Sequence, residues 1–348
     1  MSAPAEASAT VAVIGLGALG ARAARQAATN QAVSRLVLFD VDDKRLEMVH
    51  QALEEERTVV VAASSDEVLT PPAAADSPHS AGADVVIIAT PHGHVELARD
   101  AIRRGIDVVS ASDDIDQVQG LLALDPMARE LNRTVVVGAG FAPGLSCLLS
   151  AHAAARFDRV TEIHVAKAGT GGPACARQHH RALSGSACDW RDGGWVERPG
   201  GSGRELCWFP TPIDGRDCYR AALPDTILLV RSFLGVERVT ARMAANRRDR
   251  LTMKLPMLRP PHAEGGPGGV RVEVRGIRDG ASEIHVLGSM DRPGLAGGTV
   301  AAVAASALIA GRAGRCGAGG LSELFDPLPL LHDLAGRGVR AATFEGLL

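Results

Sequence analysis

The chain has 348 residues, of which 46% are hydrophobic and 22% charged, and its formal net charge is −3 at pH 7. This composition is that of a globular protein long enough for two domains, and the lack of a basic excess argues against partners such as nucleic acid or a membrane surface. The apolar stretch 296–309 contains two glycines and is shorter than the roughly 20 residues of a membrane helix, which predicts a packed internal helix. The six cysteines form no CxxC pair and the first ten residues carry no basic side chain, so we expect a cytoplasmic protein without a secretory signal.

Short β-branched runs alternate with helical patterns through the first 140 residues. Strands are predicted over 10–17, 35–40, 57–63, 83–91, 106–112 and 133–140. Helices are predicted over 18–30, 42–56, 94–105 and 116–132, and a polar, proline-bearing surface loop over 64–83. This alternation is typical of an α/β fold with a doubly wound parallel sheet, as in Rossmann domains.

A different pattern begins near Phe141. A helix is predicted over 143–157, with Pro143 in its first turn, and a second helix over about 297–312 that returns to the first domain. Period-two strands are predicted over 161–168, 238–245, 269–276 and 283–288, separated by glycine- and proline-rich loops. The inward valines and outward charges of 270–275 indicate a half-exposed, mostly antiparallel sheet in a second α+β domain.

The segment VAVIGLGALG places Gly15, Gly17 and Gly20 in GxGxxG register, directly after a strand and before a helix. Gly15 permits the tight turn, Gly17 allows close approach to a diphosphate, and Gly20 allows the helix to pack on the strand. The helix N-terminus favours an anion, so the whole turn, including Leu16, Ala18 and Leu19, is predicted to bind a dinucleotide.

Asp40 ends the second predicted strand, 20 residues after Gly20. Its carboxylate is expected to bind the ribose hydroxyls of the dinucleotide and to repel a 2′-phosphate, which favours NAD as the cofactor. Lys44 and Arg45 could neutralise that phosphate, so NADP is the alternative.

The segment ATPHGH lies at the carboxyl end of the fourth predicted strand, where ligands bind in open α/β sheets. Thr90, Pro91 and His92 are expected beside the nicotinamide ribose. For His92 and His94 a structural role, such as capping the next helix, is the alternative.

The segment GTGGPACARQHH, residues 169–180, admits several interpretations. A zinc site from Cys175, His179 and His180 is disfavoured, because adjacent histidines point apart and the spacing matches no usual ligand pair; no metal is expected. A nucleophilic Cys175 paired with His179 is one helical turn apart but lacks the surroundings of an acyl-enzyme site. A plain structural loop with solvent-facing histidines is a further alternative.

The interpretation that we favour is a loop that binds an anion and transfers a proton. Gly171 and Gly172 expose backbone N–H groups, and Arg177 can bind a carboxylate through two hydrogen bonds. Histidine exchanges protons near neutral pH. The predicted catalytic residues are His179 or His180, with Lys167 and Asp113 behind them, and Arg204, Arg220, Arg242 and Arg271 are further candidates for substrate contact.

Two known families share parts of this pattern. The order GxGxxG, Asp, ATP and GxxV resembles the glucose–fructose oxidoreductase-like enzymes, in which a Glu-Lys-Pro triplet follows the fifth strand and its lysine contributes to proton transfer; this chain has SASDD there. The segment GAGFAPGLSCLLSAHAA resembles the saccharopine dehydrogenase-like family, which interconverts amines and imines. That resemblance implies that Gly140, Phe141 and Pro143 lie near the nicotinamide and that the substrate lies between the domains.

The predicted function is therefore an NAD(P)-dependent oxidoreductase that acts on a small carboxylate-bearing amino or imino compound. A catalytically silent NAD-binding regulatory or assembly protein is the first alternative, because the family lysine is missing after the fifth strand. A metal-dependent hydrolase on a similar scaffold is the second alternative. The expected domains are an NAD(P)-binding Rossmann domain over 1–140, a substrate and dimerisation domain over 141–295, and C-terminal helices over 296–348. The exposed sheet face could be solvated or could pack against a second copy of the chain, the latter by analogy alone.

Overall fold

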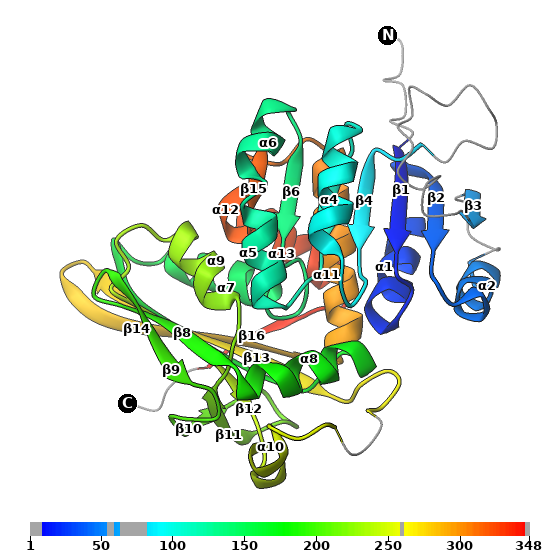
Figure 1. Cartoon of the computed structure of the whole chain (residues 1–348). Helices are drawn as coiled ribbons and strands as arrows, with labels where there is room; N and C mark the ends of the chain where they lie inside the picture. The colour runs from blue at the N-terminus through cyan, green and yellow to red at the C-terminus, as the bar shows by residue number, and fades with distance from the viewer. Residues whose placement is uncertain (1–8, 54–58, 63–81, 258–260, 345–348) are drawn as a thin grey trace.

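The computed structural model describes residues 9–53, 59–62, 82–257 and 261–344. Within them, a parallel sheet of seven strands runs in the order β15-β6-β5-β4-β1-β2-β3 (Figure 1). Its strands are β1 Ala9–Ile14, β2 Val33–Phe39, β3 Val59–Ala62, β4 Val85–Ile88, β5 Asp107–Ser110, β6 Thr134–Val137 and β15 Gly317–Gly319. The six predicted strands and the doubly wound sheet are confirmed. The seventh strand, the short β15, carries no β-branched residue and was not predicted. The predicted loop over 64–83 lies almost wholly outside the described residues.

Helices cover both faces of this sheet. The α4 helix, His94–Arg103, and the α5 helix, Ile115–Leu122, lie on one face, and the α1 helix, Ala18–Ala28, lies on the other (Figure 1). The α2 helix, Asp43–Gln51, connects β2 to β3. The single helix predicted over 116–132 is in fact two, α5 and α6, Asp125–Glu130, because Pro126 lies in the first turn of α6 and cannot continue the preceding helix.

A second, mixed sheet runs in the order β10-β11-β12-β7-β13-β14-β16, and the β8–β9 hairpin pairs with β12. Its strands are β7 Arg159–Ala168, β8 Ser186–Arg191, β9 Gly194–Pro199, β10 Glu205–Trp208, β11 Gly215–Arg220, β12 Arg238–Ala244, β13 Gly268–Arg278, β14 Ala281–Asp291 and β16 Ala341–Thr343. The four predicted strands are confirmed, but β7 and β12 pair in parallel. The hairpins from β8 to β11 were not predicted, because the segment that contains β10, RPGGSGRELCWFP, begins with glycines, proline and arginines that are typical of a loop.

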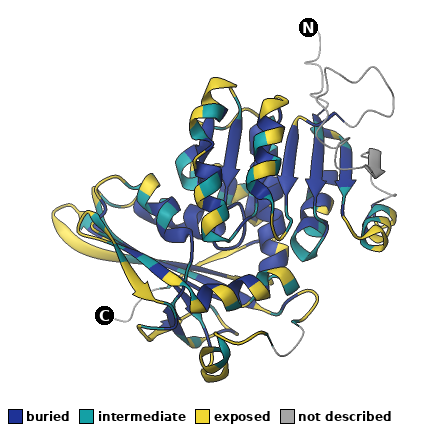
Figure 2. Cartoon of the chain, viewed as in Figure 1, coloured by how far each residue is buried: buried dark blue, intermediate teal, exposed yellow. Residues whose placement is uncertain are grey.

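Strand β13 shows that the second sheet has apolar side chains on one face and charged side chains on the other. Val270, Val272 and Val274 are completely buried, whereas Glu273 on the opposite face forms ion pairs with arginines on either side of it. Figure 2 shows the buried centre of each sheet and the exposed outer strands. The alternation predicted for 270–275 is therefore confirmed.

The α7 helix, Leu145–Ala154, follows the parallel sheet. The sequence placed Pro143 in its first turn, but the helix begins two residues later. Gly144 has φ +127°, a backbone conformation that cannot be part of an α-helix and that only glycine adopts readily. Pro143 therefore lies in the turn before the helix.

The segment 169–180, predicted as a loop, is a loop only as far as Gly172. The α8 helix, Pro173–Ser184, begins directly after it, with proline in its first turn. Gly172 has φ +117° and marks the change of direction. Cys175, Arg177 and both histidines therefore lie on a helix, so the spacing of Cys175 and His179 is one helical turn.

The α11 helix, Pro293–Ile309, returns to the first sheet as predicted and packs against α1 (Figure 1). Its small residues permit the close contact: a Cβ at Gly298 would lie 2.4 Å from the Leu19 carbonyl oxygen. In the described ranges, no helix combines the length and the hydropathy that crossing a membrane requires. The remaining helices are α9 Asp225–Ser232, α10 Arg247–Thr252, α12 Leu321–Leu324 and α13 Pro327–Gly336. The predicted domain boundaries stay a prediction.

Candidate functional site

The glycine-rich turn packs tightly on one side and is open on the other. Gly15 has φ +89°, and a Cβ there would lie 2.9 Å from the backbone of Ala89. A Cβ on Gly20 would lie 1.8 Å from the Gly15 carbonyl oxygen, whereas a Cβ on Gly17 would have no atom within 4 Å. Gly15 and Gly20 are therefore required by packing, and Gly17 borders open space. No side chain caps the N-terminus of α1, which leaves its first amides available.

Asp40 follows β2 and lies beside this turn. Its carboxylate accepts hydrogen bonds from the backbone N–H of Leu16 at 2.6 Å and of Asp42 at 2.9 Å. Arg45 donates to both of its oxygens at 3.2 Å. Asp40 is buried, while Arg45 is 41% exposed, so the carboxylate and the guanidinium present a paired, polar wall to a ligand.

A cavity of about 680 Å³ joins the turn to the second sheet. The residues predicted for the cofactor that line it are Gly15, Leu16, Gly17, Ala18, Leu19, Asp40, Thr90, Pro91, Gly140, Phe141 and Pro143. The residues predicted for catalysis or substrate that line it are Asp113, Lys167, Gly171, Gly172, Arg177 and His179. Three predicted residues do not line it: Gly20 packs beneath the turn, and His92 and His180 lie elsewhere.

His94, and not His92, is the histidine of the ATPHGH segment that borders the cavity. It is buried in the first turn of α4. Its Nε2 donates to the Thr90 carbonyl oxygen at 2.8 Å, and its Nδ1 accepts from the Ser110 hydroxyl at 2.9 Å. Burial lowers the pKa of His94, although the hydrogen bond to Thr90 opposes this effect. The ring is therefore a neutral structural link between the ends of β4 and β5.

A neutral, buried His94 makes stability dependent on pH. The unfolded chain gains a proton on this ring below about pH 6.5, while the folded chain resists it, so the free energy of unfolding falls by up to about 1.4 kcal/mol for each pH unit below that value. We expect His94→Gln to remove this share of the acid sensitivity. Urea unfolding of both proteins at several pH values between 5 and 8 measures it; equal slopes for both would contradict the prediction.

Lys167 lies near the end of β7 and is 2% exposed. Its Nζ donates to the Ala142 carbonyl oxygen at 2.9 Å and lies 4.0 Å from Asp113 Oδ2. Asp113 belongs to the loop after β5, in the SASDD segment. The SASDD segment after β5 contains no lysine, but Lys167 from the second sheet lies next to it.

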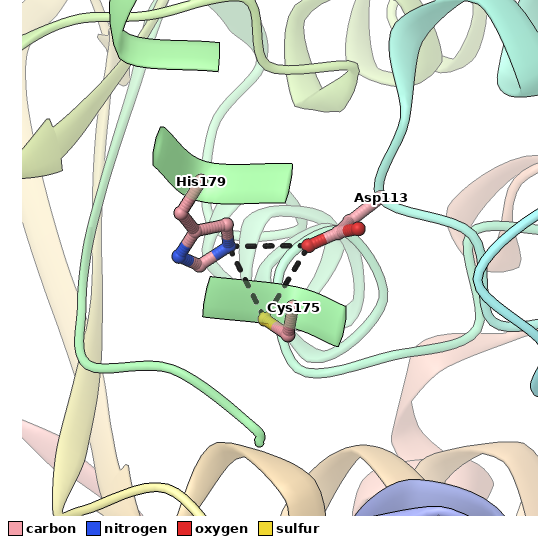
Figure 3. Close-up of side chains that lie close together, drawn as sticks. All are labelled: Asp113, Cys175 and His179. Atoms are coloured by element: carbon pink, nitrogen blue, oxygen red, sulfur yellow. Dashed lines mark hydrogen bonds and ion pairs between the residues drawn. The ribbon is translucent and has the colours of Figure 1, made fainter. Parts of the chain in front are cut away.

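Asp113 also contacts α8 (Figure 3). Its Oδ2 lies 3.1 Å from His179 Nε2 and 3.6 Å from Cys175 Sγ. Burial alone would raise the pKa of Asp113, but the hydrogen bond from His179 and the charge of Lys167 outweigh it and hold the pKa at about 2. Burial and the charge of Lys167 lower the pKa of His179, and burial and the charge of Asp113 raise that of Cys175 to about 12. Asp113 is therefore ionised, and the histidine and thiol are neutral, at pH 7.

A hydrogen bond that the sequence did not predict holds α8 against the first sheet. Gln178 Nε2 donates to Asp114 Oδ2 at 2.8 Å, and the other oxygen of Asp114 caps α5. Gly172 brings the start of α8 close to the start of α1, since a Cβ on Gly172 would lie 3.1 Å from the Ala18 Cβ. The two helix N-termini therefore border the same cavity.

The other predicted residues divide into two groups. Arg177 is exposed on α8, lines the cavity and forms no ion pair with any described residue. His180 Nε2 donates to the Leu255 carbonyl oxygen at 2.8 Å, outside the cavity, so the structure separates the two adjacent histidines. The further arginines considered are also outside it, in ion pairs of Arg204 with Asp217, Arg220 with Asp189, Arg242 with Glu205 and Arg271 with Glu273.

Searches with the sequence find no matching family profile and no matching curated protein. The fold, in contrast, matches solved structures. A probable dehydrogenase from Thermotoga maritima is 8% identical, with 96% of this chain and 98% of that chain covered and a TM-score of 0.50. DAP dehydrogenase from C. glutamicum, in complex with DAP, is 15% identical, with 95% and 99% covered and a TM-score of 0.47. UDP-N-acetylglucosamine 3-dehydrogenase from Acidithiobacillus ferrooxidans is 13% identical, with 93% and 96% covered and a TM-score of 0.47.

At these identities the similarity establishes the fold, and the match to the Thermotoga maritima protein carries that conclusion. The resemblance to glucose–fructose oxidoreductase-like enzymes is supported at the level of the fold. The resemblance to saccharopine dehydrogenase-like proteins stays a prediction. The chain therefore shares the fold of the Thermotoga maritima protein, with a parallel sheet and a second, mixed sheet.

Proposed function

We propose that this protein is an NAD(P)-dependent oxidoreductase. The observation that carries the proposal is that one cavity is bordered by the glycine-rich turn and Asp40 on one side and by Lys167 and Asp113 on the other. The glycine-rich turn and Asp40 are the features that bind a dinucleotide, and Lys167 with Asp113 can exchange a proton with a substrate.

The residues present fit a dinucleotide. Gly17 leaves open space in front of the uncapped N-terminus of α1, where a diphosphate would accept backbone hydrogen bonds. Asp40 lies at the end of β2, where its carboxylate can bind ribose hydroxyls and disfavours a 2′-phosphate, so NAD is the proposed cofactor and NADP the alternative. Arg45 already neutralises part of the charge of Asp40. The cofactor supplies the hydride acceptor or donor at its nicotinamide ring.

Lys167 is the group that we assign to proton exchange with the substrate. Its Nζ carries hydrogens and is buried at the cavity wall, and Asp113, 4.0 Å away, stabilises its charge. His179 contacts Asp113 through Nε2 and holds the carboxylate in place, which makes it a positioning residue. The proton-transfer role that the sequence assigned first to the histidines thus moves to the lysine behind them.

The proposed substrate is a small amino or imino compound with a carboxylate, as in the saccharopine dehydrogenase-like family. Arg177 lines the cavity without an ion-pair partner among the described residues, so its guanidinium is available to a carboxylate. The start of α8, after Gly171 and Gly172, offers backbone amides to the same anion.

A catalytically silent NAD-binding protein is the second candidate. It was suggested by the absence of lysine from the SASDD segment. The position of Lys167 beside Asp113 favours the enzyme, because a buried ammonium group at a ligand cavity has no evident purpose in a protein that only binds the dinucleotide.

The test has two stages. Calorimetric titration with NAD⁺, NADH and NADP⁺ is expected to show one site per chain, with NAD forms bound more tightly than NADP⁺. Absorbance of reduced nicotinamide is then followed with a panel of amino acids, 2-oxo acids with ammonia, and hydroxy acids. Turnover restricted to amino or imino carboxylates supports the full proposal. Binding without turnover on any compound supports the silent protein, and no binding by folded protein rejects both.

A further inference from the structure

Asp113, Cys175 and His179 direct three ligand atoms toward one point (Figure 3). The distances are 3.1 Å between His179 Nε2 and Asp113 Oδ2, 3.5 Å between His179 Nε2 and Cys175 Sγ, and 3.6 Å between Cys175 Sγ and Asp113 Oδ2. His179 Nε2 and Asp113 Oδ2 each contact both of the other two atoms. The three atoms therefore form a nearly equilateral triangle, and do not form a chain.

This arrangement does not suit a nucleophile–base–acid triad. Such a triad uses one ring nitrogen of histidine for the nucleophile and the other for the carboxylate. Here both contacts converge on Nε2 of His179. The third side of the triangle joins Asp113 Oδ2 directly to Cys175 Sγ at 3.6 Å. A positive ion at its centre would satisfy all three atoms at once.

The dimensions agree with tetrahedral zinc coordination. Zn²⁺ lies about 2.3 Å from sulfur and about 2.0–2.1 Å from imidazole nitrogen and carboxylate oxygen, so ligand atoms at tetrahedral angles are about 3.3–3.6 Å apart. The three observed distances of 3.1, 3.5 and 3.6 Å fall at or near that range before any ion adjusts them.

We propose that Asp113, Cys175 and His179 bind one Zn²⁺ ion, which leaves its fourth coordination position open to the cavity for water or a substrate oxygen or nitrogen. Thiolate, imidazole and carboxylate together suit zinc, and three protein ligands with one open position are typical of catalytic zinc sites. This site is a different one from the Cys175, His179 and His180 set that the sequence disfavoured, because Asp113 replaces His180.

Charge and protons balance at such a site. On binding, the Cys175 thiol releases its proton to solvent, and the ring hydrogen of His179 moves from Nε2 to Nδ1. The two anionic ligands neutralise the two charges of the ion. The ammonium group of Lys167, 4.0 Å from Asp113 Oδ2, therefore remains compatible with the loaded site.

The backbone already holds the three ligands in place. Cys175 and His179 are four residues apart on α8, which places them one above the other on the same side of the helix. Asp113 comes from the loop after β5, and Gln178 fixes α8 to the adjacent Asp114 at 2.8 Å. The metal would thus join the two parts of the molecule at the floor of the cavity.

The test measures metal binding directly. The 348-residue protein is freed of metal with a chelator, loaded with Zn²⁺ in competition with a chromophoric chelator, and assayed by elemental analysis. We expect one Zn²⁺ per chain, with affinity about a hundredfold lower or more in Asp113→Asn, Cys175→Ser and His179→Gln. His180→Gln and Cys188→Ser are matched controls outside the triangle and should keep the wild-type affinity. With Co²⁺ instead, a thiolate-to-metal charge-transfer band should appear in the wild type and be absent from Cys175→Ser.

Two results would overturn the proposal: folded wild-type protein that binds no stoichiometric Zn²⁺, or Zn²⁺ binding that the three ligand variants leave unchanged. Circular dichroism of each variant shows that a loss of metal is not a loss of folding. Calorimetry of the metal-free protein with NAD⁺ tests the proposed dinucleotide site separately, so failure of one proposal is distinguishable from failure of the other.

Discussion

Replacing Lys167 by methionine is expected to lower kcat by about a hundredfold to ten-thousandfold, the range that a positioned acid or base contributes. Methionine keeps much of the length and apolar stem of the side chain but carries no exchangeable hydrogen. Lys167 is buried at the cavity wall and forms its hydrogen bond with the Ala142 carbonyl oxygen, outside the glycine-rich turn, so the affinity for NAD should change little. The measurement is steady-state turnover on the substrate found in the panel, together with calorimetric titration of NAD⁺.

Lys254 offers a matched control, because it is exposed and does not line the cavity. Lys254→Met should leave both kcat and NAD binding unchanged. If Lys167→Met turns over like wild type, the proton comes from another group. If the variant loses NAD binding to the same extent as turnover, Lys167 has a structural role and the assignment is wrong.

Gly17→Ala and Gly20→Ala should fail in opposite ways, although the two residues lie three positions apart. A methyl group on Gly17 meets no protein atom within 4 Å, so the fold should tolerate it. It would occupy the space proposed for the diphosphate, and we expect a loss of NAD affinity of about tenfold to a hundredfold, or about 1.4–2.8 kcal/mol. A methyl group on Gly20 would lie 1.8 Å from the Gly15 carbonyl oxygen, so the helix must shift, at a cost of roughly 3 kcal/mol in stability.

Urea unfolding and NAD⁺ titration of the two variants test this pair. The expected pattern is normal stability with weak binding for Gly17→Ala, and reduced stability for Gly20→Ala. Tight NAD⁺ binding by Gly17→Ala would show that the diphosphate does not lie at this turn. A Gly20→Ala protein as stable as the wild type would show that α1 can move away from β1 freely.

Local sequence was sufficient to predict the parallel sheet and the glycine-rich turn. The strands of the first 140 residues are continuous apolar runs, and the residues of GxGxxG are close together in the chain. The same reasoning missed α8, because Gly169, Gly171 and Gly172 dominate the start of the segment. Pro173 was the available signal, since proline is favoured in the first turn of a helix.

The remaining candidate site depends on contacts that local sequence does not contain. Asp113 and His179 are 66 residues apart. Asp113 follows a strand of the parallel sheet and His179 lies on the helix after a strand of the mixed sheet, so only the tertiary fold brings them together. One compositional signal did point to Lys167: of the 37 basic residues in the chain, three are lysine, and the others are arginine. Arginine does not lose its proton in proteins, so a rare lysine within a strand is a natural candidate for proton exchange.

The hydrogen bond between Gln178 and Asp114 affects how far α8 and the first sheet can move relative to each other. Asp114 caps α5 with one oxygen and accepts a hydrogen bond from Gln178 of α8 with the other, so α8 cannot move away from the first sheet without breaking that bond. This bond opposes opening of the cavity between α8 and the first sheet. Reactants would instead enter a largely preformed chamber, and selectivity would come from its fixed shape, with little contribution from movement after binding.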